Sequence, residues 1–167
     1  MLAAAMVAGS VLAYGSLPER IPLHFDVAGT PGNYQATSPL TWFGTVGIAL
    51  LLGGMCYALA VVLPRYPKLI NVPDKRRFMA LPREGQLRIS RLGQTLLFGT
   101  TTFLLLLFGL VQYGSYQVAV GVSDGLPGSV SVAILGLIFT SMIMSPFVII
   151  RMQKLQKEIE KEYDGSR

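Results

Sequence analysis

The chain has 167 residues, of which 51% are hydrophobic and only 14% are charged, and its net charge is +5. This balance is too apolar for a soluble domain and indicates a single-domain integral membrane protein. The single cysteine, Cys56, excludes an intramolecular disulfide, and the cations lie beside the apolar stretches, so membrane topology explains them better than nucleic-acid binding does.

Four apolar stretches follow one another along the chain. Residues 1–16 are apolar but short, and we interpret them as a first, short span because they lack the basic start of a signal peptide. Residues 40–63, 92–114 and 128–150 each exceed twenty residues and contain no Asp, Glu, Lys, Arg or His. About twenty helical residues cross a hydrocarbon core about 30 Å thick. The sequence therefore predicts an all-α integral membrane protein with four transmembrane helices.

The Lys and Arg residues are distributed unevenly between the connecting segments. Residues 17–39 carry one, the segment between the third and fourth spans carries none, residues 64–91 carry eight, and residues 151–167 carry five. Short segments rich in Lys and Arg are usually retained in the cytoplasm. We therefore expect both termini to be cytoplasmic, with an outer loop at 17–39, a basic cytoplasmic loop at 64–91 and a cytoplasmic helical tail at 151–167.

The outer loop contains four prolines and two glycines, a composition that predicts an ordered cap with reverse turns. It also holds the only histidine, His24, two residues before Asp26. A catalytic zinc site needs about three protein ligands, so we expect hydrogen bonding within the loop and no metal or other cofactor. Ser16 and Ser38 lie in no recognisable nucleophile motif, and we therefore expect no enzymatic activity.

The predicted spans contain no ionisable groups, which disfavours an ion-coupled carrier. We expect their polar side chains to bond to backbone or to neighbouring helices, with a threonine-lined pore as the alternative; these side chains are Gln94, Thr95, Thr100, Thr101, Thr102, Thr140, Ser141 and Ser145. Small residues recur at four-residue spacing, which favours close helix packing within the chain or with a membrane-protein partner or second copy; in the first span they are Ala5, Gly9 and Ala13. Aromatic residues near the span ends are expected to anchor the protein at the headgroups; they are Trp42, Tyr66, Tyr113 and Tyr116.

The basic loop predicts a Pro-bounded turn at residues 71–74, followed by a basic amphipathic segment. Clustered cations at a cytoplasmic membrane face gain about 1 kcal/mol each from the negative surface potential, so anionic lipid headgroups are the expected partner. A dedicated site for a protein or a headgroup is the alternative.

Two motifs resemble those of a family of small bacterial multi-span membrane proteins of unknown function. Leu17 to Gly29 is similar to that family's LP-x-x-IP-x-HF-N-x-x-G signature, and Asn71 to Lys75 is similar to its N-x-P-N-K element. The outer-loop module also occurs in Sdp-type toxin-immunity proteins, so the resemblance implies sensing or immunity at the bacterial cytoplasmic (inner) membrane. The candidate partner or ligand contacts lie in or beside these motifs: His24, Asp26, Asn33, Tyr34, Asn71, Pro73, Asp74 and Lys75.

The leading hypothesis is thus a non-enzymatic inner-membrane protein that acts in sensing or immunity through its outer loop. A structural or accessory subunit of a larger membrane complex is the first alternative, because the spans offer small-residue stripes and few functional groups. A small channel or transporter is the second.

Overall fold

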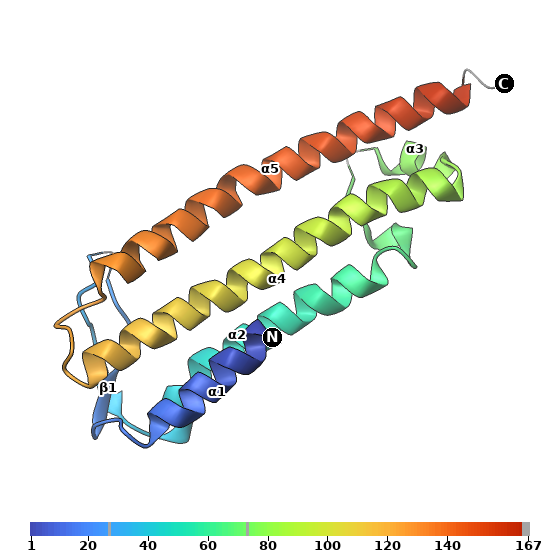
Figure 1. Ribbon diagram of the computed structural model, residues 1–167. Coiled ribbons are helices and arrows are strands. Elements are labelled where there is room, and N and C mark those ends of the chain that lie inside the picture. The colour runs from blue at the N-terminus through green and yellow to red at the C-terminus, as the bar shows by residue number, and fades with distance from the viewer. Residues whose placement is uncertain (27, 73, 165–167) are drawn as a thin grey trace. The chain divides into compact units, whose positions relative to one another are not determined.

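The computed structural model describes residues 1–26, 28–72 and 74–164, and these are mostly helical (Figure 1). In chain order the elements are α1 (Leu2–Tyr14), β1 (Arg20–Pro22), β2 (Tyr34–Ala36), α2 (Pro39–Val62), the 3₁₀ helix η1 (Pro67–Leu69), α3 (Lys75–Ala80), α4 (Arg83–Ala119) and α5 (Gly128–Asp164). Three helices, α2, α4 and α5, are long and apolar enough to cross a membrane. An all-α membrane protein is thereby supported in outline.

The elements differ from the sequence expectation in two places and agree with it in a third. The loop at 17–39 contains a two-stranded antiparallel sheet, so the chain is not purely helical. The third predicted span is part of a longer helix that begins at Arg83 and continues to Ala119. The helical continuation predicted after residue 150 is confirmed, since α5 runs to Asp164.

Helix α1 has 13 residues and therefore rises about 20 Å, which is less than the hydrocarbon thickness of about 30 Å. It falls below the length at which a helix counts as a candidate span. A membrane span at residues 1–16 therefore stays a prediction.

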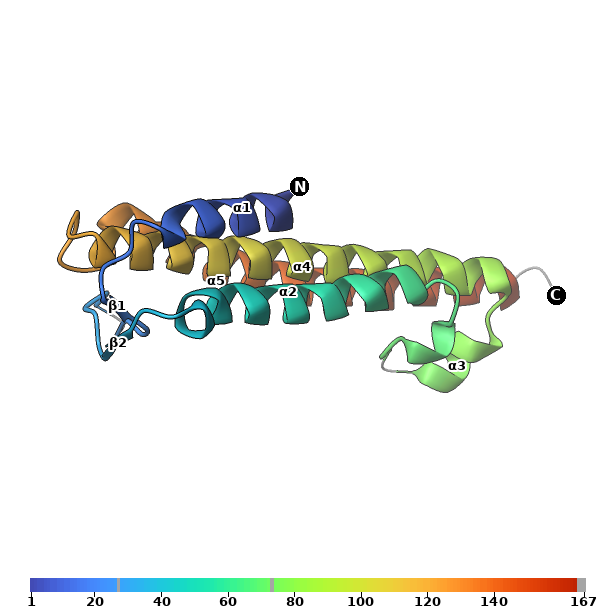
Figure 2. The ribbon, with the colours of Figure 1, turned by 90° about the horizontal axis from the view of Figure 1, so that it is seen from below.

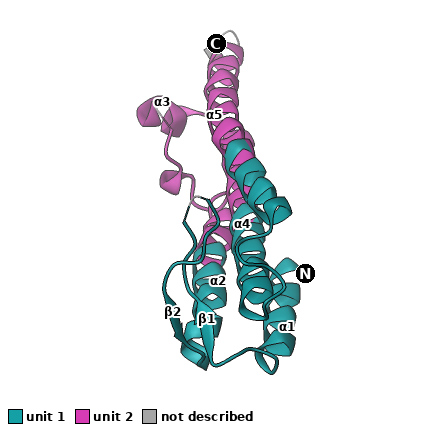
Figure 3. Cartoon of the chain, turned by 90° about the vertical axis from the view of Figure 1, so that its left-hand side faces the viewer, with its two compact units in different colours: residues 1–53, 102–139 teal, residues 54–101, 140–167 magenta. Residues whose placement is uncertain are grey.

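The chain divides into two compact units, coloured separately in Figure 3. Unit 1 comprises Met1–Gly53 and Thr102–Phe139, and unit 2 comprises Gly54–Thr101 and Thr140–Arg167.

In unit 1, the strands β1 and β2 pair in the register Arg20 to Ala36, Ile21 to Gln35 and Pro22 to Tyr34. They lie near the start of α2 (Figure 2). Ladder hydrogen bonds join Leu23 N to Asn33 O and Thr37 N to Glu19 O, so the backbone groups of Tyr34 and Ala36 point away from β1.

The outward-pointing carbonyls of β2 accept hydrogen bonds from side chains of the same chain. The Arg20 guanidinium donates to the Tyr34 carbonyl at 2.9 Å, and the Thr41 hydroxyl donates to the Ala36 carbonyl at 3.1 Å. On the other strand, Pro22 has no N–H to offer. The bonds block the carbonyls on the β2 edge, and Pro22 removes one donor from the β1 edge, which disfavours pairing with another strand.

Helix α2 begins with a reciprocal cap. The Ser38 hydroxyl accepts from Thr41 N, while the Thr41 hydroxyl accepts from Ser38 N at 2.8 Å. Pro39 occupies the first helical position, where a missing N–H costs nothing. The helix start is therefore encoded locally, and it fixes the point at which the loop ends.

Unit 2 has the principal hydrophobic core. Phe78 of α3 and Ile89 of α4 are fully buried, and side chains from the segment after η1, from α4 and from α5 surround them. The core residues are Leu63, Ile70, Val72, Phe78, Leu81, Ile89, Met152 and Ile159. The segment between α2 and α4 is thus a folded element and not a simple basic linker.

Helix α4 contacts α2 through two glutamines. In unit 2 the Gln94 amide donates to the Ala60 carbonyl at 2.9 Å, and in unit 1 the Gln112 amide donates to the Trp42 carbonyl at 3.1 Å. The paired positions are 18 residues apart in both helices (112 minus 94, and 60 minus 42), which is five helical turns. Polar side chains in the apolar helices therefore serve helix packing at these positions.

Candidate functional site

The loop at 17–39, called the hairpin loop below, is held in shape by Asp26. The Asp26 carboxylate accepts from Ala28 N at 2.9 Å and from Thr30 N at 2.8 Å, and its N–H donates to the Thr30 carbonyl. Such side-chain-to-backbone bonds form an Asx turn. The carboxylate of Asp26 is therefore engaged in folding the loop, as the sequence led us to expect.

Gly29 closes this turn and joins the hairpin loop to the segment before α5. Its φ of 82° lies in the left-handed region that favours glycine. Its carbonyl accepts from Leu126 N at 2.8 Å, and a Cβ on Gly125 would lie 2.8 Å from the same carbonyl oxygen. Two segments far apart in sequence are thereby locked together by backbone contacts within unit 1.

The other predicted residues of the hairpin loop are exposed. His24 and Asn33 use their backbone carbonyls inside the loop, accepting from Gly32 N and Leu23 N respectively. Tyr34 keeps 39% of its surface exposed, on a strand whose three residues are all exposed. No group of three or more metal-binding side chains occurs among the described residues. The loop thus presents His24, Asn33 and Tyr34 on a preformed backbone.

Unit 1 also contains a cluster of buried and half-buried side chains around Trp42. The indole N–H of Trp42 donates to the Ser10 carbonyl at 2.8 Å, and its ring lies 6.5 Å from that of Tyr116. The Tyr116 hydroxyl is 3.1 Å from the Ser16 hydroxyl. Trp42 is only 2% exposed, so it joins α1, α2 and α4 instead of lying at a headgroup surface as expected.

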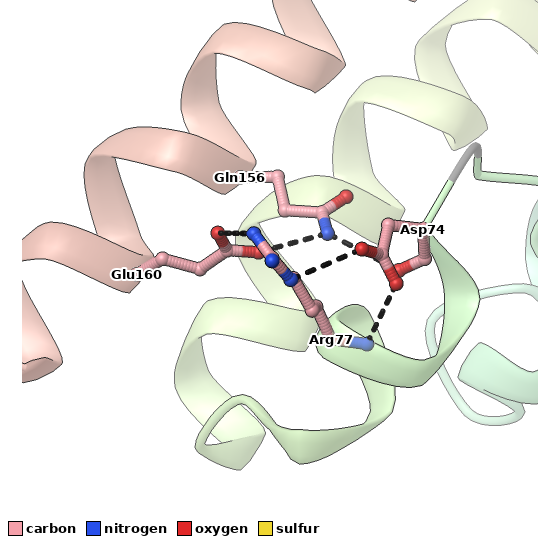
Figure 4. A network of polar contacts seen from close by, with 4 residues as sticks. All are labelled: Asp74, Arg77, Gln156 and Glu160. Atoms are coloured by element: carbon pink, nitrogen blue, oxygen red, sulfur yellow. Dashed lines mark hydrogen bonds and ion pairs between the residues drawn. The ribbon is translucent and has the colours of Figure 1, made fainter.

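In unit 2, the second motif forms a polar network with α5 (Figure 4). Asp74 caps α3 by accepting from Arg77 N at 3.1 Å, and its carboxylate pairs with the Arg77 guanidinium at 3.1 Å. The Gln156 amide donates to the Asp74 carbonyl at 3.2 Å and to Glu160 at 3.1 Å. Glu160 also pairs with Arg77 at 3.8 Å. The network attaches the start of α3 to α5.

The remaining predicted residues of this motif lie apart from the network. Asn71 and Lys75 are exposed and have no polar contact recorded in the described part of the chain, and Pro73 lies outside the described residues. All eight cations of the segment at 64–91, called the basic loop below, are exposed. Three of these take part in intramolecular bonds through their side chains: Arg77, Arg83 and Arg88.

Sequence reasoning overlooked Trp42, Gln112 and Gln156 as structural anchors. Gln112 lies inside the predicted span at 92–114 but was not counted among its polar side chains, although its 18-residue distance from Gln94 is the spacing of one helix face. Gln156 lies in a run of charged residues in which one amide carries no distinguishing pattern.

Residues 1–52 match the sequence profile of DUF1648, a domain of unknown function. The match covers α1, both strands and the first part of α2. No curated protein and no solved structure matches the chain at a significant level. The matched segment includes the hairpin loop but not the α3 network.

Proposed function

We propose that the chain is a non-enzymatic membrane protein that recognises a partner through the hairpin loop, in a sensing or immunity role. The observation that carries this proposal is that some residues of the loop fix its backbone while the side chains of others are exposed. Asp26, Gly29 and the ladder bonds fix the backbone, whereas the side chains of His24 and Tyr34 remain exposed. A preformed loop loses little conformational entropy on binding, and this favours recognition.

The blocked strand edges specify how the partner binds. Because Arg20 and Thr41 take up the outward carbonyls of β2, an incoming strand finds no free carbonyl row. The partner therefore contacts side chains, above all the Tyr34 ring, which offers both apolar area and a hydroxyl.

A photo-reactive benzophenone residue in place of Tyr34 tests this function. In native membranes we expect one protein adduct of discrete mass from position 34, and none from position 122, which is exposed in the neighbouring segment of the same unit. The additional change His24→Ala should weaken the adduct. Equal labelling from both positions, or no adduct from position 34, contradicts the proposal.

The same proposal places the protein in the bacterial cytoplasmic membrane with four spans, α1 among them, and with both termini in the cytoplasm. The support is the charge distribution, with one cation in residues 17–39 against eight in residues 64–91. A membrane-impermeant maleimide tests it in intact cells, in a Cys56→Ser background. Tyr34→Cys should be labelled and Lys75→Cys should be protected until the membrane is opened.

The basic loop is proposed to bind anionic lipid headgroups. Its cations are all exposed. Three of them lie on α3, which the buried side chain of Phe78 attaches to the core of unit 2. Replacing Lys75 and Arg76 by Gln leaves the Asp74–Arg77 pair intact. We expect weaker retention of phosphatidylglycerol in mild detergent, measured by lipid analysis of the purified protein, with phosphatidylcholine as the control lipid.

A second candidate function is that of a subunit in a larger membrane complex. It is favoured by the exposure of α4 and α5, whose most apolar windows contain no buried residue. Lipid or partner helices must cover these surfaces. Purification from native membranes distinguishes the two candidates, because a stoichiometric complex supports a subunit and an isolated protein supports recognition by the hairpin loop alone.

A further inference from the structure

An open groove of about 440 Å³ lies in unit 1 between α1, the start of α2 and the second half of α4. Ligand sites in proteins typically have volumes of about 300 to 1,000 Å³. Along α1 the groove extends from Ala5 to Ala13, a rise of about 12 Å. Trp42 lines it from α2, and Gly109 to Tyr116 line it from α4.

Small residues create this groove. Ala5, Gly9 and Ala13 form the stripe that the sequence assigned to close helix packing, yet all three line open space. A Cβ added to Gly9 or to Gly109 would meet no atom within 4 Å. The neighbouring helices therefore do not pack against this stripe of small residues, and a groove remains between them.

The chemistry of the lining restricts what can occupy the groove. The lining contains no Asp, Glu, Lys, Arg or His, so nothing there would neutralise a charged ligand. At one end lie two hydroxyls, that of Tyr116, which contacts Ser16, and that of Tyr113, which contacts Gln117, whereas the Trp42 indole N–H and the Gln112 amide farther along are already bonded to backbone carbonyls. The other end, around Ala5 and Met6, is apolar.

The Ser10 hydroxyl is closed off from solvent and does not select the ligand. Ser10 lines the groove, and its hydroxyl is buried without a hydrogen-bond partner among the described residues. Buried polar atoms are nearly always satisfied in native proteins. Water is a poor filling, because a bound water molecule needs two to four polar partners and most of this lining is apolar.

We propose that the groove binds one acyl chain of a membrane lipid, with the lipid's polar end toward Tyr113 and Tyr116. The proposal rests on the membrane location, since α2 and α4 are apolar enough to place the groove beside lipid. An acyl chain is uncharged, narrow and flexible, and so matches a lining that is apolar along its length and polar at one end. Binding of this kind is independent of any partner at the hairpin loop.

The chain contains its own reporter, because Trp42 is its only tryptophan and lines the groove while remaining 2% exposed. The full chain is reconstituted in phosphatidylcholine vesicles whose acyl chains carry bromine, which quenches indole fluorescence at short range. An acyl chain in the groove comes closer to the Trp42 ring than lipid at the outer surface of the helices does. Quenching of Trp42 relative to unbrominated vesicles therefore reports an acyl chain in the groove.

Two filling variants and one matched control complete the experiment. Gly9→Leu and Gly109→Leu each place a side chain in the groove, whereas Gly47→Leu adds the same side chain on an exposed part of α2 where a Cβ also meets nothing within 4 Å. Circular dichroism establishes that each variant folds, and either filling variant suffices. We expect strong quenching in the wild type and in Gly47→Leu, and about two-fold weaker quenching in a filling variant.

Equal quenching in the filling variants and the control overturns the proposal. Resistance of the wild-type Trp42 to bromine overturns it as well, whether the groove closes or a second copy of the chain fills it. Failure at the hairpin loop leaves this result unaffected, because the fluorescence measurement needs no protein partner.

Discussion

The substitution Phe78→Ala tests whether the basic loop is a folded element. Phe78 is fully buried in a core formed with the segment after η1, α4 and α5, and α3 itself has only six residues. A helix this short does not persist without tertiary packing. Truncation of a buried phenylalanine costs about 3 to 5 kcal/mol. Because each 1.4 kcal/mol is a factor of ten, the population of the open loop should increase by a factor of roughly one hundred to a few thousand.

Limited trypsin digestion of the reconstituted protein measures this opening, because Lys75, Arg76 and Arg77 are cleavage sites within α3. When opening is fast relative to cleavage, the rate follows the population of the open loop. Leu69→Ala is the control, since Leu69 is 55% exposed in η1 and its truncation should change the rate by less than about three-fold. Similar rates in the two variants would refute the reasoning that the buried core holds the loop.

Three further predictions concern single contacts. Asp74→Ala should cost about 1 kcal/mol by removing the cap of α3 and should raise hydrogen exchange of the α3 amides about five-fold, whereas Asp74→Asn retains a capping oxygen and should change exchange little. Gly29→Ala should cost about 1 to 2 kcal/mol because of its positive φ and its contact with Leu126, whereas Gly32→Ala should be nearly neutral; thermal unfolding in detergent compares the two, and equal melting temperatures contradict the argument. Gln112→Leu should lose about 0.6 to 1.7 kcal/mol in the same assay through its bond to the Trp42 carbonyl, and no loss would indicate that α4 is held there by apolar contacts alone.

The long helices could be predicted from the sequence because hydrophobicity alone determines them. The predicted spans at 40–63 and 128–150 lie on α2 and α5 almost to the residue at the helix start. Helix ends beyond the apolar stretch were less accessible. Arg83 to Arg91 were assigned to a loop because they are polar, yet they form the first turns of α4, where packing against Phe78 and Ile159 selects the helix.

The small sheet and the candidate sites were predictable only in part. Proline and glycine content predicted turns in the hairpin loop, and Asp26 does bond within it, but three-residue strands carry no periodic signal. The roles of Asp74 and Trp42 depend on partners far away in sequence, Gln156 and Ser10. A single sequence gives no indication of such pairings.

The protected edges of the β1–β2 sheet have a consequence for crowding. Copies of a membrane protein share one plane and one orientation, so their protruding hairpins meet at the same height and at high local concentration. An unprotected strand edge would then add copies one after another into an intermolecular sheet. Because Arg20 and Thr41 occupy the carbonyls of Tyr34 and Ala36, β2 is disfavoured from pairing with a strand of a neighbouring hairpin. We therefore expect hairpins of neighbouring copies not to join through their β2 edges.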